Sequence, residues 1–224
     1  MNRINSAVIG LVAAISLETS AYAQTAYSAV PQWHGRWRAS SSTPTYKPVT
    51  IHANLPVECD DEAGRAAATW NGAQALLRYS APQVTALDEV PPESPYNLQK
   101  VYLREGDLED GVLMRASWDS VASSTSGLPT IYGVIIRVNT DNLYYGADRT
   151  GNYYCGSPDA LDNTEFDYES VLFHELGHSF GFRHGADPNC PMYPSVIRGA
   201  SRRVPCPDEA QSFRDLYDPK VTPY

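Results

Sequence analysis

The chain has 224 residues and a formal net charge of −9 at pH 7. That length fits one domain of ordinary size with a hydrophobic core of its own. The negative charge argues against nucleic acids and anionic membranes as partners. We expect a monomer whose partner is a protein or a peptide.

Residues 1–23 have the pattern of an export signal. Arg3 supplies a basic start, residues 7–17 form an apolar run, and Ala21 to Ala23 provide a small-residue cleavage site. The apolar run is too short to cross a bilayer of roughly 30 Å. We expect the mature chain to be exported, either secreted or periplasmic, without a membrane anchor.

The next segment, residues 24–48, is rich in Ser, Thr, Pro and aromatic residues and has no sustained periodicity. It is interpreted as an N-terminal extension or a short propeptide, and the sequence does not choose between them. We assign residues 49–224 to one domain. Its first element is a β-strand over residues 49–53, which are rich in β-branched side chains.

A helix then begins at a capping Asp60 or Asp61, and Trp70 on its apolar face is expected in the core. The glycines at 106 and 111 indicate a hairpin turn. In residues 131–139, Tyr132 is expected on the same face as the aliphatic residues that follow it. The predicted strands cover residues 76–79, 101–104, 112–117 and 131–139.

Two helices come late in the chain. One begins near Thr164 or Asp167 and ends at about Phe180, and the other spans roughly residues 208–216. Strands gathered before two late helices indicate an α+β fold rather than a regular alternation of strands and helices. We expect the first of these helices to pack against the sheet, with a substrate cleft between them.

Four cysteines form an even set, which favours two disulfides in an exported chain. Three pairings are possible. We favour Cys190 with Cys206, which closes a short loop, and Cys59 with Cys155. The competing interpretation, thiolate binding of zinc, is weakened because the chain contains no C-x-x-C pair.

The densest functional signal lies at residues 174–184. His174 and His178 are four residues apart, so on a helix they project from the same face toward one metal ion. Gly181 tolerates the positive φ that ends many helices, and the turn brings His184 round as a third ligand. Three histidines leave one position open, which is typical of a catalytic zinc site.

Glu175 lies next to the first histidine, where it can contact a zinc-bound water. Zinc lowers the pKa of such a water, and Glu175 can act as the general base during attack on a carbonyl. The hypothesis is a zinc-dependent endopeptidase. The alternatives are a zinc-stabilised binding module without activity and a narrow metalloamidase that cleaves cell-wall crosslinks.

Acidic and amide side chains are frequent between Asp141 and Asp167. Oxygen ligands of this kind suit calcium, although the chain has no EF-hand loop. A solvated loop explains them equally well. Calcium is therefore a second candidate cation beside one catalytic zinc.

The three histidines, Glu175, Gly181 and the downstream Met192 together resemble the metzincin metallopeptidases, and most of all their matrixin branch. The resemblance implies that Met192 forms the Met-turn beneath the metal. It also implies a metzincin-like fold, in which a twisted mixed sheet packs on an N-terminal helix and the zinc helix, followed by a C-terminal helix.

The sequence differs from the usual matrixin pattern at two positions. Gly185 stands where a serine usually follows the third histidine, and Val196 stands where many relatives have a tyrosine that lines the substrate pocket. The histidines of the family's second, structural zinc have no counterpart. The resemblance therefore implies one zinc ion.

Overall fold

A computed structural model describes residues 35–38, 43–73, 75–86, 90–96, 98–109, 111–121, 128–139 and 153–217. The predicted export signal, residues 1–23, lies outside these ranges, as do residues 141–152 of the candidate calcium region. Among the described residues, no helix has the length and apolar character needed to cross a membrane.

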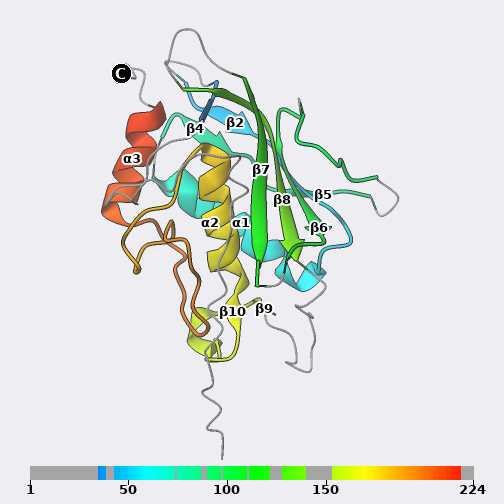
Figure 1. Ribbon diagram of the computed structural model, residues 1–224, viewed down its shortest axis with the longest axis vertical. Coiled ribbons are helices and arrows are strands. Elements are labelled where there is room, and N and C mark those ends of the chain that lie inside the picture. The colour runs from blue at the N-terminus through cyan, green and yellow to red at the C-terminus, as the bar shows by residue number, and fades with distance from the viewer. Residues whose placement is uncertain are drawn as a thin grey trace, which may run out of the picture.

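The elements follow one another as strands, an early helix, more strands and two late helices (Figure 1). Their bounds are β1 (Arg36–Trp37), β2 (Thr45–Lys47), β3 (Val49–Ile51), a 3₁₀ turn (Val57–Cys59), α1 (Asp60–Gly72), β4 (Leu77–Tyr79), β5 (Gln83–Val84), β6 (Val101–Gly106), β7 (Met114–Val121), β8 (Thr130–Asn139), β9 (Tyr153–Tyr154), a 3₁₀ turn (Pro158–Ala160), β10 (Phe166–Asp167), α2 (Tyr168–Phe180) and α3 (Pro207–Tyr217).

The main sheet is mixed. β1, β8, β6, β3 and β5 pair in parallel in that order, and β7 pairs with β8 in the antiparallel direction. The short strands β2 and β4 pair with each other, as do β9 and β10. This layered arrangement of sheet and helices confirms the predicted α+β fold.

Strands β1 and β2 lie inside the segment 24–48 that the sequence left as an extension or propeptide. β1 pairs with the start of β8, and Trp37 is buried. The indole Nε1 of Trp37 donates to the carbonyl oxygen of Ser179 at 2.7 Å, and its backbone N–H donates to the hydroxyl oxygen of Tyr217 at 3.1 Å. Part of this segment thus contacts both late helices.

The predicted hairpin at Gly106–Gly111 is wrong. β6 and β7 do not pair with each other, because β8 lies between them and pairs with both (Figure 1). The segment with these glycines therefore connects two strands that lie on opposite sides of β8. As a result β7, and not β6, lies next to α2.

Two smaller predictions are also wrong. Cys59, and neither Asp60 nor Asp61, is the N-cap of α1, because the 3₁₀ turn leads directly into the helix. Tyr132 does not share the core face of β8. The pairing with β7 passes from Gly133 to Ile131, so a β-bulge at Tyr132 turns Ile131 into the core instead.

The core lies between the sheet and the helices, and Trp70 is at its centre as predicted. Its ring stacks on Phe173 of α2 at a centroid distance of 4.6 Å and meets Phe213 of α3 edge-on at 5.4 Å. Its Nε1 donates to the carbonyl oxygen of Phe173 at 3.0 Å. One side chain of α1 therefore contacts both late helices, which positions α2 relative to the rest of the domain.

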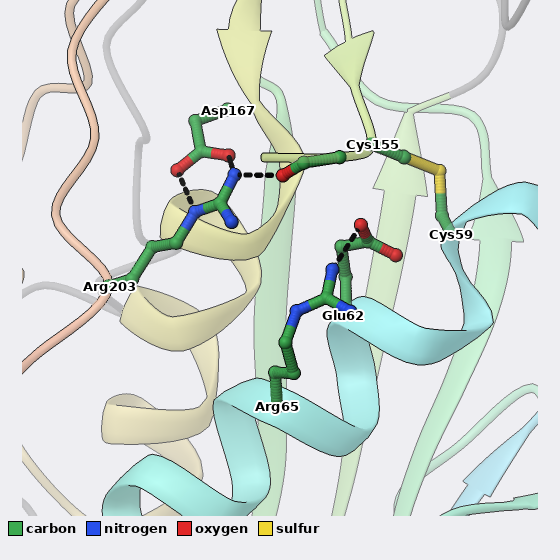
Figure 2. Close-up of a disulfide and its surroundings, with 7 residues drawn as sticks. Cys59, Glu62, Arg65, Cys155, Asp167 and Arg203 are labelled. Carbon is green, nitrogen blue, oxygen red and sulfur yellow. Dashed lines mark hydrogen bonds and ion pairs between the residues drawn. A yellow bond between two sulfur atoms is a disulfide. The ribbon is translucent and has the colours of Figure 1, made fainter. Parts of the chain in front are cut away.

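Ion pairs join α1 and the start of α2 to the segment before α3. Figure 2 shows the pair of Arg203 with Asp167 and the pair of Arg65 with Glu62. Arg203 pairs with Asp167 and Glu169, and Arg65 pairs with Glu169 and Glu62. The three carboxylates are buried. The disulfide from Cys59 to Cys155 lies beside this network, as Figure 2 shows.

Candidate active site

The three histidines singled out by their spacing come together at one point. His174 and His178 project from α2, and His184 comes from the segment after the helix. The Nε2 atom of His178 lies 2.9 Å from that of His174 and 3.2 Å from that of His184. All three rings are buried, so protein atoms shield the cluster from bulk water.

Backbone carbonyls orient two of these rings. His174 Nδ1 lies 2.6 Å from the carbonyl oxygen of Pro191, and His178 Nδ1 lies 2.8 Å from that of Phe182. A carbonyl oxygen can only accept a hydrogen bond, so each Nδ1 carries the proton and each Nε2 presents a lone pair. This is the tautomer that metal-binding histidines adopt.

Two imidazole lone pairs that face each other at 2.9 Å repel unless a cation lies between them. Nitrogens bound to zinc lie about 2.0–2.1 Å from the metal. At a tetrahedral angle that places them roughly 3.3–3.4 Å from each other, which is close to the spacing seen here. The donor set therefore fits zinc, and three protein ligands leave one coordination position open.

Burial also determines the charge of these rings. It lowers the pKa of His178 to about 4 and that of His184 to about 3, and it holds the pKa of His174 well below its usual value. The neighbouring imidazoles lower the pKa values of His174 and His184 further. At neutral pH the cluster is uncharged, the form that binds a metal.

Glu175 is buried beside this cluster, between α2 and β7. Its Oε2 accepts a hydrogen bond from the backbone N–H of Ala116 at 2.7 Å, whereas its buried Oε1 has no hydrogen-bond partner among the described residues. Burial raises the pKa of Glu175 to about 8, against the lowering effects of the Ala116 N–H and of Arg115. The N–H of Ala116 on β7 thus holds one carboxylate oxygen of Glu175 in place.

Gly181 ends α2 with a φ of +110°, as its place in the spacing predicted. Its backbone N–H donates to the carbonyl oxygen of His178 at 2.8 Å, and the N–H of Phe182 donates to that of Gly177 at 3.2 Å. These bonds close the last turn, and His184 follows three residues later. The glycine therefore allows the chain to return toward its own helix.

Gly181→Ala is expected to destabilise the fold by roughly 2–4 kcal/mol. The φ alone costs an alanine about 1–3 kcal/mol, and its Cβ would overlap the carbonyl oxygen of Gly35, which adds an overpacking cost of about 1 kcal/mol. Gly64→Ala in α1 is the matched control. Its Cβ meets no atom within 4 Å, so we expect a gain of about 0.5–1 kcal/mol. Urea unfolding measures both, and equal stabilities would contradict this account.

Met192 is fully buried. Its sulfur packs on Gly177, where a larger residue would overlap it. The carbonyl oxygen of Met192 accepts from the N–H of Gly185 at 2.8 Å, next to the third histidine. The carbonyl oxygen of the neighbouring Pro191 accepts from His174. The turn at Met192 therefore contacts His174 directly and the backbone next to His184.

The sequence did not reveal how this turn is held. Glu209 of α3 accepts from the N–H of Met192 at 2.9 Å through one oxygen and from the N–H of Cys206 at 3.0 Å through the other. Cys206 and Glu209 are three residues apart, which is the spacing of a capping box. In the sequence, the three-residue spacing of Cys206 and Glu209 is the feature from which this contact could have been predicted.

The cysteines pair as favoured from the sequence, Cys59 with Cys155 and Cys190 with Cys206. The second disulfide closes the segment that contains Met192. Cys190, Cys206 and Glu209 form the one other cluster of metal-type ligands within the described ranges. Its sulfurs are bonded to each other, so the histidine cluster is the metal candidate.

Comparisons with known proteins agree with this geometry. A family model described as Matrixin matches residues 36–218. Metalloendoproteinase 1 of Glycine max is 30% identical over 90 residues, which cover 39% of this chain and 28% of that relative. The chain thus matches well under half of that protein's length.

Among solved structures, one similar chain is High choriolytic enzyme 1, a hatching enzyme zinc-protease from Oryzias latipes (Medaka fish). It shares 15% sequence identity with a TM-score of 0.33, over 66% of this chain and 50% of that chain. The Matrixin match, in contrast, extends over most of the chain and includes the histidine cluster, Glu175 and Met192. The chain is therefore a member of the matrixin family.

Proposed function

We propose that the chain is an exported, zinc-dependent endopeptidase. His174, His178 and His184 hold the zinc, and Glu175 is the general base. The observation that carries the proposal is the convergence of the Nε2 lone pairs beside Glu175, whose Oε1 has no hydrogen-bond partner within the described part of the chain. The membership in the matrixin family supports the same assignment.

When bound, zinc supplies a Lewis acid and lowers the pKa of water at its open position. The residues of the chain do the rest. Glu175 keeps one oxygen on Ala116 and uses the other to accept a proton from the attacking water. It then delivers that proton to the departing amine, so peptide hydrolysis needs no covalent enzyme intermediate.

Strand β7 is the proposed support for a peptide substrate. Among the described strands it pairs only with β8, on one side. An extended peptide can add to its other side through backbone hydrogen bonds. Ala116 of β7 contacts Glu175, so a peptide aligned there passes close to the base and the metal.

The remaining assignments stay proposals. The division into residues 1–23, 24–48 and 49–224, with an export signal first, agrees with two disulfides, which persist in oxidising compartments. Met192 is proposed to form the Met-turn beneath the metal. Gly181 is proposed to form the turn at the end of α2 that brings His184 to the metal. A protein or peptide substrate, a monomeric state and calcium as a second cation also stay predictions.

The proposal predicts one zinc per chain and complete dependence of proteolysis on it. A chelator should abolish cleavage of an unfolded protein such as casein, and zinc, but not calcium, should restore it. His178→Ala should lose both zinc and activity, because two ligands hold zinc far less tightly than three. Metal analysis and a casein assay on the same samples measure both effects.

His52→Asn is the matched control, since His52 is also buried but lies outside the cluster. We expect it to keep its zinc and its activity. Cleavage that survives full chelation would overturn the proposal. A zinc-loaded wild type that cleaves no protein would overturn it too. If that enzyme cleaved only cell-wall fragments, the assignment as an endopeptidase would be replaced by the assignment as a metalloamidase.

A further inference from the structure

The end of α2 lies between two of the proposed zinc ligands. His178 belongs to the last turn of the helix, and His184 follows three residues after the glycine that ends it. His178 Nδ1 donates to the carbonyl oxygen of Phe182 at 2.8 Å, so the ring of one ligand bonds to the backbone that leads to the other. The placement of both rings therefore depends on how this last turn is held.

The last four carbonyl oxygens of an α-helix have no partner inside the helix. In α2, distant side chains bond to the final two of them. Nε1 of Trp37 donates to the carbonyl oxygen of Ser179 at 2.7 Å. The hydroxyl of Tyr217 donates to the carbonyl oxygen of Phe180, also at 2.7 Å. The end of this helix is thus completed by one residue from β1 and one from α3.

Trp37 and Tyr217 also bond to each other. The backbone N–H of Trp37 donates to the hydroxyl oxygen of Tyr217 at 3.1 Å, while the same hydroxyl donates to α2. Both side chains are buried, and Nζ of Lys47 lies 4.6 Å from the centre of the Trp37 ring. The pairing of β1 with β8 holds the backbone of Trp37 in place. The two aromatic residues therefore form one connected support for the helix end.

The backbone before Trp37 contacts the glycine that ends α2. The carbonyl oxygen of Gly35 lies 1.9 Å from the point where a Cβ at Gly181 would stand. The N–H of Arg36 donates to the carbonyl oxygen of Pro129 at 2.9 Å, which holds this stretch beside β8. Residues 35–37 thus contact residues 179–181, either directly or through the hydroxyl of the α3 tyrosine.

We propose that Trp37 is a positioning residue for the metal site. With Tyr217, it holds the last turn of α2 closed, the conformation in which His178 and His184 reach one zinc ion. A buried carbonyl oxygen that loses its donor carries a desolvation cost, so the turn opens in part of the molecules when the indole N–H is removed. The apparent zinc affinity scales with the fraction of molecules in which the turn is closed, and it therefore falls.

The inference rests on the zinc-binding part of the proposed function, and it extends the catalytic unit. Residues 35–37 lie before the proposed domain of residues 49–224, yet they complete the helix that carries two ligands. If residues 24–48 contain a removable propeptide, the cut falls before Gly35, so that Trp37 stays in the active enzyme.

Trp37→Phe tests the role of the indole, because phenylalanine keeps an aromatic ring and lacks the Nε1 donor. We expect its zinc dissociation constant to rise about 10-fold, the size typical of losing a residue that supports a metal ligand. Competition with a chromophoric chelator measures that constant. A purely structural role would lower the unfolding temperature but leave the zinc affinity of the folded chain unchanged. Tyr217→Phe removes the other donor and should weaken zinc binding in the same direction.

Tyr153→Phe is the matched control. Tyr153 is also a buried aromatic residue, and its hydroxyl donates to the carbonyl oxygen of Leu113 at 2.6 Å. That carbonyl lies outside α2 and the turn after it, so the variant should bind zinc as tightly as the wild type. A zinc affinity that falls equally in the control would overturn the inference, as would wild-type affinity in both Trp37→Phe and Tyr217→Phe.

The N-terminus of the enzyme gives a second readout. Mass spectrometry of the zinc-loaded, peptide-cleaving enzyme should find a chain that begins before Gly35, and an active chain that begins after Trp37 would overturn the inference. A zinc-loaded wild type that cleaves no peptide overturns the proposed activity alone, because zinc affinities still compare the variants. A wild type that binds no zinc overturns both.

Discussion

Replacing Glu175 by glutamine is expected to leave zinc bound while lowering kcat/KM by roughly 10²–10⁴-fold. Glutamine has nearly the same shape as glutamate. Its carbonyl oxygen can take the place of Oε2, which accepts from the Ala116 N–H at 2.7 Å. The atom in place of Oε1 becomes an amide nitrogen that cannot accept a proton. The loss therefore reports on proton transfer rather than on packing.

The measurement pairs kcat/KM on a cleaved peptide with zinc content and with thermal unfolding of the same samples. Glu58→Gln is the control, because Glu58 is exposed in the turn before α1 and should behave as the wild type. Two results would contradict the assignment. One is a zinc-loaded Glu175→Gln enzyme with most of its activity, and the other is loss of zinc, since Glu175 is placed outside the ligand set.

The metal cluster could be predicted because its geometry is local. His174 and His178 need only one helical turn to face the same point, and Gly181 needs only its own φ to end the helix. His184 follows within three residues of that turn. Spacing along the chain thus determines positions in space, without knowledge of any distant contact.

The partners of that cluster could not be predicted in the same way. Ala116 reaches Glu175 only because β7 lies next to α2, and the sequence indicated a hairpin between β6 and β7 instead. The glycines indicate a turn after β6, but they do not indicate on which side of β8 the next strand pairs. Pairing between distant strands depends on the whole sheet, so this part of the site needed the structure.

The N-terminal strand shows the same limit. The composition of residues 24–48 did not decide between an N-terminal extension and a short propeptide, whereas in the structure Trp37 lies buried against the ends of α2 and α3. A two-residue strand carries no periodicity that a sequence pattern could detect. Its place is determined by contacts with residues more than a hundred positions away.

The ion pairs around Asp167 could not be read from the sequence either, and they lead to the largest expected effect on stability. Arg203→Met should destabilise the fold by about 3–5 kcal/mol. Arg203 Nε and Nη2 bond to Asp167 at 2.8 and 2.5 Å, and Nη1 bonds to Glu169 at 3.0 Å. Removing the cation leaves Asp167 buried and charged, whereas Glu169 keeps its second partner, Arg65.

Arg104→Met is the matched control for this effect. The Arg104 side chain is 14% exposed, close to the 13% of Arg203, but its partner Glu93 is 81% exposed whereas Asp167 is fully buried. A pair with an exposed partner contributes only about 0–1 kcal/mol, so the control should lose far less stability. Urea unfolding at neutral pH measures the free energy of unfolding of both variants.

The double variant Arg203→Met with Asp167→Asn separates an unpaired charge from lost packing. Asparagine keeps the shape of Asp167 and can still accept the hydrogen bond that Ser170 Oγ donates at 2.5 Å. If the buried charge causes the loss, the double variant should recover at least about 1 kcal/mol relative to Arg203→Met alone. A double variant that is less stable than the single one would contradict this account. The loss would then come from the packing of the Arg203 side chain and its bond to the carbonyl oxygen of Gly156.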